Sequence, residues 1–123
     1  MHRVLVVDDE PGIRHIVKLA LERIDVVVSE AESGHHALEQ LNATSIDVVI
    51  VDLTLPDING INLMGRIRRI APALPIVLIS ASTQLQSEAN PARPTAVLEK
   101  PFKLEQLQNV ILRALALRWH DVP

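Results

Sequence analysis

The sequence predicts a doubly wound α/β domain, in which helices cover both faces of a five-stranded parallel sheet. Three observations favour this fold. Five short runs rich in Val and Ile are bounded by strand breakers, amphipathic helical patterns lie between most of them, and the runs are apolar almost throughout. Continuous apolarity is typical of parallel strands that are buried on both faces. The alternation favours right-handed crossovers within one sheet, and we expect the strand order 2-1-3-4-5.

Five segments satisfy the strand pattern. These predicted strands are Arg3–Val7, Asp25–Ser29, Asp47–Asp52, Pro75–Ser80 and Ala96–Glu99. Four segments satisfy the helix pattern, one with a serine N-cap and one with a proline just beyond its end. They are Gly12–Arg23, Gly34–Leu41 after Ser33, Asn59–Ile70 before Pro72, and Leu104–Trp119.

The connection between the fourth and fifth strands departs from this regularity. It contains Pro91 and Pro94, and proline disfavours helix both at itself and at the residue before it. At most about two turns of helix, near residues 84–89, fit between these constraints. We therefore expect the fourth helix of the fold to be short or degraded.

Composition restricts the class of protein. A chain of 123 residues is long enough for one domain with one core, which we expect to span about residues 3–118, and 48% hydrophobic residues argue against disorder. There is no cysteine, which excludes disulfides and thiolate metal sites. A net charge of −3 and only two aromatic residues, Phe102 and Trp119, argue against nucleic-acid binding. Without a membrane-length apolar run or a signal-peptide pattern, we expect a soluble cytoplasmic domain.

Polar residues follow the predicted strands at their carboxyl ends. Asp8 and Asp9 come after the first strand, Asp52 ends the third, Ser80 ends the fourth, and Lys100 follows the fifth. In open α/β sheets, ligands bind at this edge, where the strand order reverses. In the expected order the first and third strands are neighbours, separated by roughly 5 Å. Three carboxylates, a hydroxyl and an ammonium at one edge predict a site for phosphoryl transfer.

The same residues lie in four longer motifs whose order and spacing carry a family resemblance. The motifs are VLVVDDEPGIR, VVIVDLTLPDINGINLM, PIVLISAS and EKPF. With them the whole chain resembles a receiver domain of the bacterial two-component response regulators. This resemblance implies a flavodoxin-like (CheY-like) fold, a phosphoacceptor aspartate, a Mg²⁺ site, and a sensor histidine kinase or histidine phosphotransfer protein as partner.

The resemblance assigns a role to each site residue, and each role also agrees with the chemistry of the side chain. Asp52 is the expected nucleophile, which becomes an aspartyl phosphate. Asp9, Asp52 and the backbone carbonyl of Thr54 are the expected direct Mg²⁺ ligands, with Asp8 acting partly through water. Lys100, before a cis-proline turn, is expected to neutralise a phosphate oxygen, and Ser80 to donate a hydrogen bond to the phosphoryl group.

Less specific interpretations of these residues stay open at the level of sequence. Any of the three aspartates can cap a helix or a following segment, a lone lysine is usually a surface residue, and a serine often ends a strand in a turn. Two other functions also remain as alternatives. One is an aspartate-nucleophile phosphohydrolase of the haloacid dehalogenase type, although that family has a second aspartate where Thr54 stands. The other is an interaction module that does not depend on phosphorylation.

Two features concern signalling rather than chemistry. Receivers usually have an aromatic switch residue three positions before the lysine, and Val97 occupies that position here. The last predicted helix has a wider apolar surface than one buried stripe requires, which favours an exposed patch around Leu112 or Leu117 and Trp119. Such a patch predicts a homodimer or a docking site, and core packing with a frayed C-terminal end is the alternative.

Overall fold

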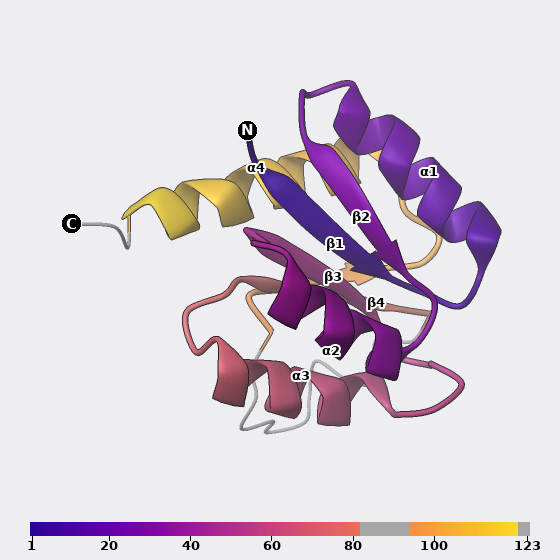
Figure 1. Ribbon diagram of the computed structural model, residues 1–123. Helices are drawn as coiled ribbons and strands as arrows, with labels where there is room; N and C mark the ends of the chain where they lie inside the picture. The colour runs from indigo at the N-terminus through magenta and orange to yellow at the C-terminus, as the bar shows by residue number, and fades with distance from the viewer. Residues whose placement is uncertain (82–93, 121–123) are drawn as a thin grey trace.

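The computed structural model describes residues 1–81 and 94–120, with side chains described to residue 117. Five parallel strands form one sheet between two layers of helices (Figure 1). The strands are β1 (Arg3–Val7), β2 (Val27–Ala31), β3 (Val48–Asp52), β4 (Ile76–Ser80) and β5 (Ala96–Glu99). The helices are α1 (Pro11–Glu22), α2 (Gly34–Ala43), α3 (Gly60–Ile70) and α4 (Leu104–His120).

The order of the strands is β2-β1-β3-β4-β5, as predicted. All four neighbouring pairs are parallel. The chain moves outward from β1 to β2, crosses back to β3, and then continues to β4 and β5. The strand order therefore reverses between β1 and β3, and the carboxyl ends of these two strands lie side by side at the point where such sheets bind ligands.

Each face of the sheet is covered by two helices, and each interface is a separate hydrophobic cluster. On one side α1 and α4 pack on Val4, Val6, Ile50 and Ile79, with Leu107 and Ile111 from α4 fully buried. On the other side α2 and α3 pack on the alternate strand residues, among them Leu5, Val49 and Leu78. Every residue of β3 and β4 is buried, which explains their apolar sequences, because a central parallel strand has no solvent face.

The helix boundaries agree with the predictions to within one residue, except that α2 extends two residues past its predicted end. Ser33 caps α2, accepting a hydrogen bond from the amide of His36 at 3.1 Å. Asn59 caps α3, accepting from the amide of Ile61 at 2.7 Å. The short fourth helix predicted near residues 84–89 lies outside the described residues, so α4 is the helix that follows β5.

The prediction for β2 was wrong at both ends. Strand β2 begins at Val27 rather than Asp25, because Asp25 has a φ of 61° and lies in the turn that ends α1. Aspartate is one of the few residues that tolerate this left-handed conformation. The strand also ends at Ala31 rather than at the predicted Ser29.

No helix within the described ranges 1–81 and 94–120 combines the length and the apolar character that crossing a membrane requires.

Candidate functional site

Asp8 and Asp52 are buried carboxylates at the ends of adjacent strands. Val7 pairs with Val51 in the register of β1 and β3, so the next residue of each strand is an aspartate. Asp8 has no exposed surface and Asp52 is 6% exposed, which makes them, with Ser80, the buried polar residues of the described chain. Their position is the carboxyl edge at which the sequence predicts a site.

Lys100 reaches this pair from the end of β5. Its backbone amide donates to the carbonyl of Ser80 at 2.8 Å, which joins it to the end of β4, and the bond to Pro101 is cis, as expected. The Nζ atom lies 3.5 Å from Oδ2 of Asp8 and 3.7 Å from Oδ2 of Asp52. One ammonium therefore faces two carboxylates, in a place where it is largely shielded from solvent.

The electrostatics of this group favour an additional cation. Burial raises the pKa of the Asp52 carboxyl above its ordinary value, and the charge of Asp8 raises it further. The charge of Lys100 and a hydrogen bond from the Thr54 amide act in the opposite direction but do not cancel this rise. The pKa of Asp52 is therefore raised first by burial and second by the neighbouring negative charge, and a divalent cation would offset both effects by stabilising the charged carboxylate.

Three consecutive acids at the end of β1 supply oxygen ligands for such a cation. Asp8, Asp9 and Glu10 each place a ligand atom within 4.8 Å of the others. Asp8 is buried, whereas Asp9 and Glu10 are exposed. Carboxylate oxygens are the ligands that Mg²⁺ prefers, so the donor set fits this ion. Glu10 was not among the sequence-predicted ligands, although the unbroken run of acids could have indicated it.

The loop after Asp52 is held close to its aspartate. The amide of Thr54 approaches Oδ1 of Asp52 at 3.4 Å, and a backbone bridge joins Thr54 to Asn59. The amide of Gly60 donates to the carbonyl of Leu53 at 2.7 Å. A Cβ atom on Gly60 would lie 2.5 Å from the carbonyl oxygen of Asp52, so only glycine permits this approach.

A comparison with protein-family models decides the family. The model of the response regulator receiver domain matches residues 4–112, which is most of the chain. The chain belongs to this family. Its residues Asp8, Asp52, Ser80 and Lys100 therefore lie at one edge of a receiver domain of a two-component system.

Curated relatives support this assignment, and they include one protein of similar length and others that are much longer. The response regulator receiver protein CpdR of Brucella abortus is 32% identical, and the match covers 94% of this chain and 98% of CpdR. The DNA-binding transcriptional regulator NtrC of Proteus hauseri is 31% identical over 91% of this chain, but only 24% of its own length is covered. For the transcriptional regulatory protein TrcR of Mycobacterium tuberculosis, 32% identical over 85% of this chain, the covered share is 42%. The chain thus spans nearly all of CpdR but less than half the length of NtrC and of TrcR.

Solved receiver structures have the same fold. The response regulator protein TrrA of Thermotoga maritima, in complex with Mg²⁺ and BeF, superposes with a TM-score of 0.87 at 31% identity, covering 94% of this chain and all of TrrA. The chemotaxis protein CheY4 of Vibrio cholerae gives 0.87 at 29% identity, covering 94% of this chain and 99% of CheY4. A CheY-like receiver from Methanospirillum hungatei gives 0.92 at 22% identity, which supports the fold alone.

This receiver departs from the usual pattern at Val97. The residue lies in β5, opposite Leu78 of β4, and packs partly buried against the cluster formed with α2 and α3. A β-branched side chain has one strongly preferred rotamer and little length, so it has no large alternative position to adopt. A switch based on an aromatic rotamer is therefore absent from this position.

Proposed function

We propose that this receiver accepts a phosphoryl group on Asp52 from the phosphohistidine of a sensor histidine kinase or a histidine phosphotransfer protein, in a Mg²⁺-dependent reaction. Phosphorylation would then act through a change of conformation or of protein–protein contacts. One observation carries the proposal: the buried Asp52 carboxylate ends β3 beside Asp8, with the Lys100 ammonium 3.7 Å away.

The reaction on Asp52 is a displacement at phosphorus. A carboxylate oxygen of Asp52 forms the new O–P bond, and the N–P bond of the partner's phosphohistidine breaks. The electron pair of that bond returns to the imidazole nitrogen, which takes up a proton. Because the transition state is loose, catalysis depends mainly on positioning and on charge stabilisation.

The residues that would hold Mg²⁺ are Asp9, Asp52 and the backbone carbonyl of Thr54, with Asp8 partly through water. The acidic cluster of Asp8, Asp9 and Glu10 supports this assignment and adds Glu10 as a neighbouring carboxylate. When bound, the ion would neutralise charge on the phosphoryl oxygens. Before phosphorylation it would also offset the repulsion among these carboxylates, which raises the pKa of Asp52.

Lys100 and Ser80 would stabilise the phosphoryl group once it is on Asp52. The Lys100 ammonium already lies between Asp8 and Asp52, where a phosphoryl oxygen would replace part of the carboxylate contact. Ser80 is buried at the end of β4, directly after the residue paired with Asp52. A hydroxyl there can donate one hydrogen bond to a phosphate oxygen.

Phosphorylation by a small donor tests the proposal without a known kinase. Incubation with acetyl phosphate and Mg²⁺ should increase the mass of the intact protein by about 80 Da, the mass of one phosphoryl group. The increase should be absent in Asp52→Ala and should require the metal. A protein that gains no mass under these conditions would contradict the proposal. Steady release of phosphate from many small esters would instead favour a phosphohydrolase.

Val97 favours a second candidate function, a module that binds its partner independently of phosphorylation. Val97 packs partly buried against the α2–α3 cluster. Without an aromatic side chain at this position, we expect weaker coupling between Asp52 and a distant surface, and a correspondingly small shift in conformational population. A partner that binds wild type and Asp52→Ala with equal affinity, with or without acetyl phosphate, would support this function.

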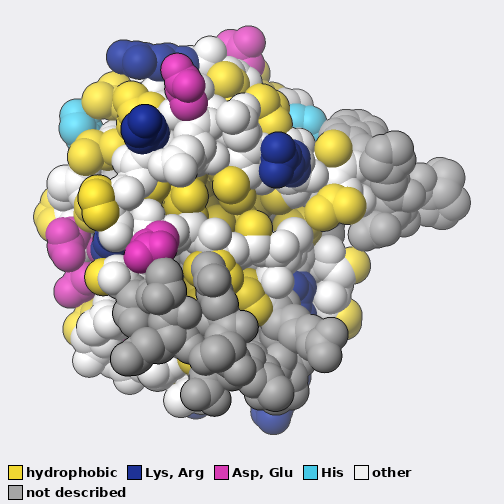
Figure 2. Space-filling model, turned by 180° about the vertical axis from the view of Figure 1, so that it is seen from behind, with side chains coloured by type: hydrophobic (Ala, Val, Ile, Leu, Met, Phe, Trp, Pro, Cys, Tyr) yellow, Lys and Arg dark blue, Asp and Glu magenta, His cyan; other side chains and the backbone are white. Residues whose placement is uncertain are grey.

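We also propose a homodimer that forms through α4. Leu112 and Leu117 of this helix are 47% and 52% exposed. Hydrophobic side chains gather in a band across the face of the molecule opposite to the view of Figure 1 (Figure 2). Apolar surface of this kind favours association.

We further propose that residues 1–123 form one domain, with a core of about residues 3–118. We propose that this domain acts in the cytoplasm, which is consistent with its family.

A further inference from the structure

We propose that Arg14 is a positioning residue for the metal site, because it fixes the peptide that joins Asp8 to Asp9. The inference rests on the proposed function, since it concerns how the acidic cluster is prepared for Mg²⁺. The sequence analysis assigns no role to Arg14, and its side chain takes no direct part in the proposed phosphoryl transfer. It acts through the backbone of Asp8 and through Glu30 of β2.

The guanidinium of Arg14 connects α1 to both neighbouring strands. Its Nη1 atom donates to the carbonyl oxygen of Asp8 at 2.6 Å, and its Nε atom donates to Oε1 of Glu30 at 3.2 Å. The Arg14 side chain is 15% exposed and the Glu30 side chain is 39% exposed, so the bond to the buried Asp8 is the better shielded of the two. Hydrogen bonds from a charged donor are stronger than neutral ones, and burial strengthens them further.

The backbone carbonyl of Asp8 is bonded by Arg14, while the other polar groups of Asp8 have other partners. The Asp8 amide donates to the carbonyl of Ala31 at 3.1 Å. Of its carboxylate oxygens, Oδ1 accepts from the amide of Glu10 at 2.9 Å, and Oδ2 lies 3.5 Å from Nζ of Lys100. With the Arg14 contact included, every polar group of this buried residue has a partner.

The consequence falls on Asp9, the expected direct ligand. The carbonyl of Asp8 and the amide nitrogen of Asp9 belong to one planar peptide unit. A donor that fixes the carbonyl oxygen therefore also fixes the direction in which Asp9 leaves the strand. Asp9 is exposed, so packing does not restrain it. The hydrogen bond from Arg14 to the Asp8 carbonyl therefore restrains the backbone at Asp9, which side-chain packing does not.

Arginine suits this task better than lysine. Its planar guanidinium offers donors in a fixed arrangement and can serve two acceptors at once, whereas an ammonium is a single point charge. Glu30, on the edge strand, holds the guanidinium in the orientation that reaches Asp8. Residues that orient metal ligands in this way typically change metal affinity about 10- to 100-fold when they are replaced.

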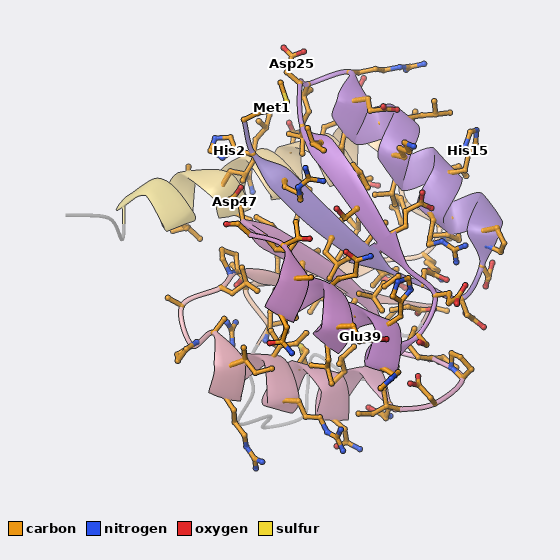
Figure 3. All side chains as sticks on the ribbon, viewed as in Figure 1. Met1, His2, His15, Asp25, Glu39 and Asp47 are labelled. Atoms are coloured by element: carbon orange, nitrogen blue, oxygen red, sulfur yellow. The ribbon has the colours of Figure 1, made fainter. Side chains whose placement is uncertain are left out.

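A purely structural link between α1 and β2 would produce the same contacts, so the test needs a matched control. Arg3 provides one, since its Nη1 atom donates to Oγ of Ser29 at 3.0 Å and thus also links to β2. Arg3 begins β1, at the opposite end of the strand from Asp8. His2 and Asp47, labelled in Figure 3, lie together at this amino end of the sheet.

The experiment measures Mg²⁺ affinity and unfolding in parallel. Mg²⁺ alone is titrated by calorimetry into wild type and the variants Arg14→Met, Arg14→Lys, Glu30→Gln and Arg3→Met, and urea unfolding is recorded for each. We expect Arg14→Met to weaken Mg²⁺ binding by about 10- to 100-fold. Arg14→Lys should recover part of this loss and Glu30→Gln should show a smaller one. Arg3→Met should lower stability without changing Mg²⁺ affinity by more than about twofold.

The outcomes separate this inference from the proposed function. Mg²⁺ affinity in Arg14→Met equal to that of wild type would overturn it, and so would an equal loss in Arg3→Met, which would indicate general destabilisation. If Arg14→Met does not fold, Arg14→Lys and Glu30→Gln decide by the same criteria: unchanged Mg²⁺ affinity in both overturns the inference. A wild-type protein that binds no Mg²⁺ contradicts the proposed metal site, and the role of Arg14 falls with it.

Discussion

At the scale of single residues, Asp52 is held in a state that costs folding free energy. Its carboxylate is removed from water and lies near Asp8, and both effects raise its pKa. Lys100 compensates two carboxylates with one charge. A residue selected for stability alone would be apolar here, as the rest of β3 is. The arrangement supports the proposal that this site receives a cation and a phosphoryl group.

We predict that Asp52→Asn stabilises the metal-free protein at neutral pH. A carboxyl whose pKa is raised in the folded state binds its proton more tightly there, so stability is lost as pH rises through the folded pKa. Asparagine removes this loss. Urea unfolding in a chelator should therefore show the variant to be more stable than wild type at pH 7, with the difference shrinking as pH falls toward about 4, near the ordinary pKa of aspartate.

Asp47→Asn is the control for this prediction. Asp47 precedes β3 at the other end of the sheet, and its carboxylate accepts from the amide of Arg3 at 2.9 Å. An asparagine oxygen can accept the same bond, so no stabilisation at neutral pH is expected. Equal or lower stability of Asp52→Asn relative to wild type at pH 7 would mean that the charge of Asp52 is already compensated.

We predict that Lys100→Met slows phosphorylation by acetyl phosphate by about 10²-fold or more, because the charge next to the phosphoryl oxygens is lost. The rate of mass increase at saturating Mg²⁺ measures the effect. Lys103→Met, three residues further on and exposed, is the matched control and should react at the rate of wild type. Similar rates for both variants would remove Lys100 from the chemistry.

Much of the site was predictable at this scale, for a physical reason. Asp8, Asp52, Ser80 and Lys100 end or follow apolar strands, and parallel strands bring their carboxyl ends to one edge. Arg14 was not predictable, because its partner is a backbone carbonyl and helical spacing says nothing about such a bond.

At the scale of elements, the loop between β3 and α3 is fixed to the start of α2. The Asp57 carboxylate accepts from the amides of Gly34 and His35, each at 2.9 Å, so it caps α2 from a different part of the chain. Ile58 packs over Gly34, where a Cβ atom would meet its side chain at 2.2 Å. The loop that carries Thr54 is therefore restrained from both α2 and α3.

We predict that Asp57→Ala lowers the free energy of unfolding at pH 7 by roughly 1 kcal/mol or somewhat less, since Asp57 is exposed and salt screens its charge. The two backbone hydrogen bonds lower the pKa of Asp57 in the folded state. Its contribution is therefore complete above the unfolded pKa and disappears as pH falls through the folded pKa. Urea unfolding across this acidic range should show wild type and variant converging, and a constant difference would contradict the charged cap.

We predict opposite effects for two glycines of α3. Gly60→Ala should lower the free energy of unfolding by about 1–3 kcal/mol, because its Cβ atom would lie 2.5 Å from the Asp52 carbonyl oxygen and 2.7 Å from Cα of Leu53. Gly65→Ala should be neutral or stabilise by up to about 1 kcal/mol, because nothing lies within 4 Å and alanine favours helix. Chemical unfolding of both variants measures this. A stabilised Gly60→Ala would show that the loop after Asp52 tolerates displacement.

The sequence periodicity predicted which helices and strands form, but it predicted the residues at which they begin and end less reliably. Helix α2, capped by Ser33, began where predicted, whereas α3 begins one residue later than predicted because Asn59 is its cap. The start of β2 was missed because Asp25 and Val26 read as extended residues, whereas Asp25 turns the chain at the end of α1. A left-handed residue other than glycine leaves no clear mark in the sequence.

At the scale of the whole molecule, the two hydrophobic clusters cover both faces of the sheet, but they do not bury all the apolar side chains of α4. Leu107, Ile111, Ala114 and Leu115 of this helix are buried, which completes one stripe. Leu112 and Leu117 project elsewhere and are about half exposed. The wide apolar surface predicted for this helix is therefore confirmed for these two leucines, while the side chain of Trp119 lies outside the described residues.

We predict that this surface produces a concentration-dependent dimer that Leu117→Glu weakens. A charge placed in an apolar interface must be desolvated without a partner, which opposes association but costs the monomer little at an exposed site. Sedimentation equilibrium over a range of concentrations measures the mass of wild type and variant. Arg69→Glu, a charge change on an exposed residue of α3, which covers the other face of the sheet, is the control for a general effect of charge. A wild-type monomer at every concentration, both with acetyl phosphate and without it, would exclude the dimer.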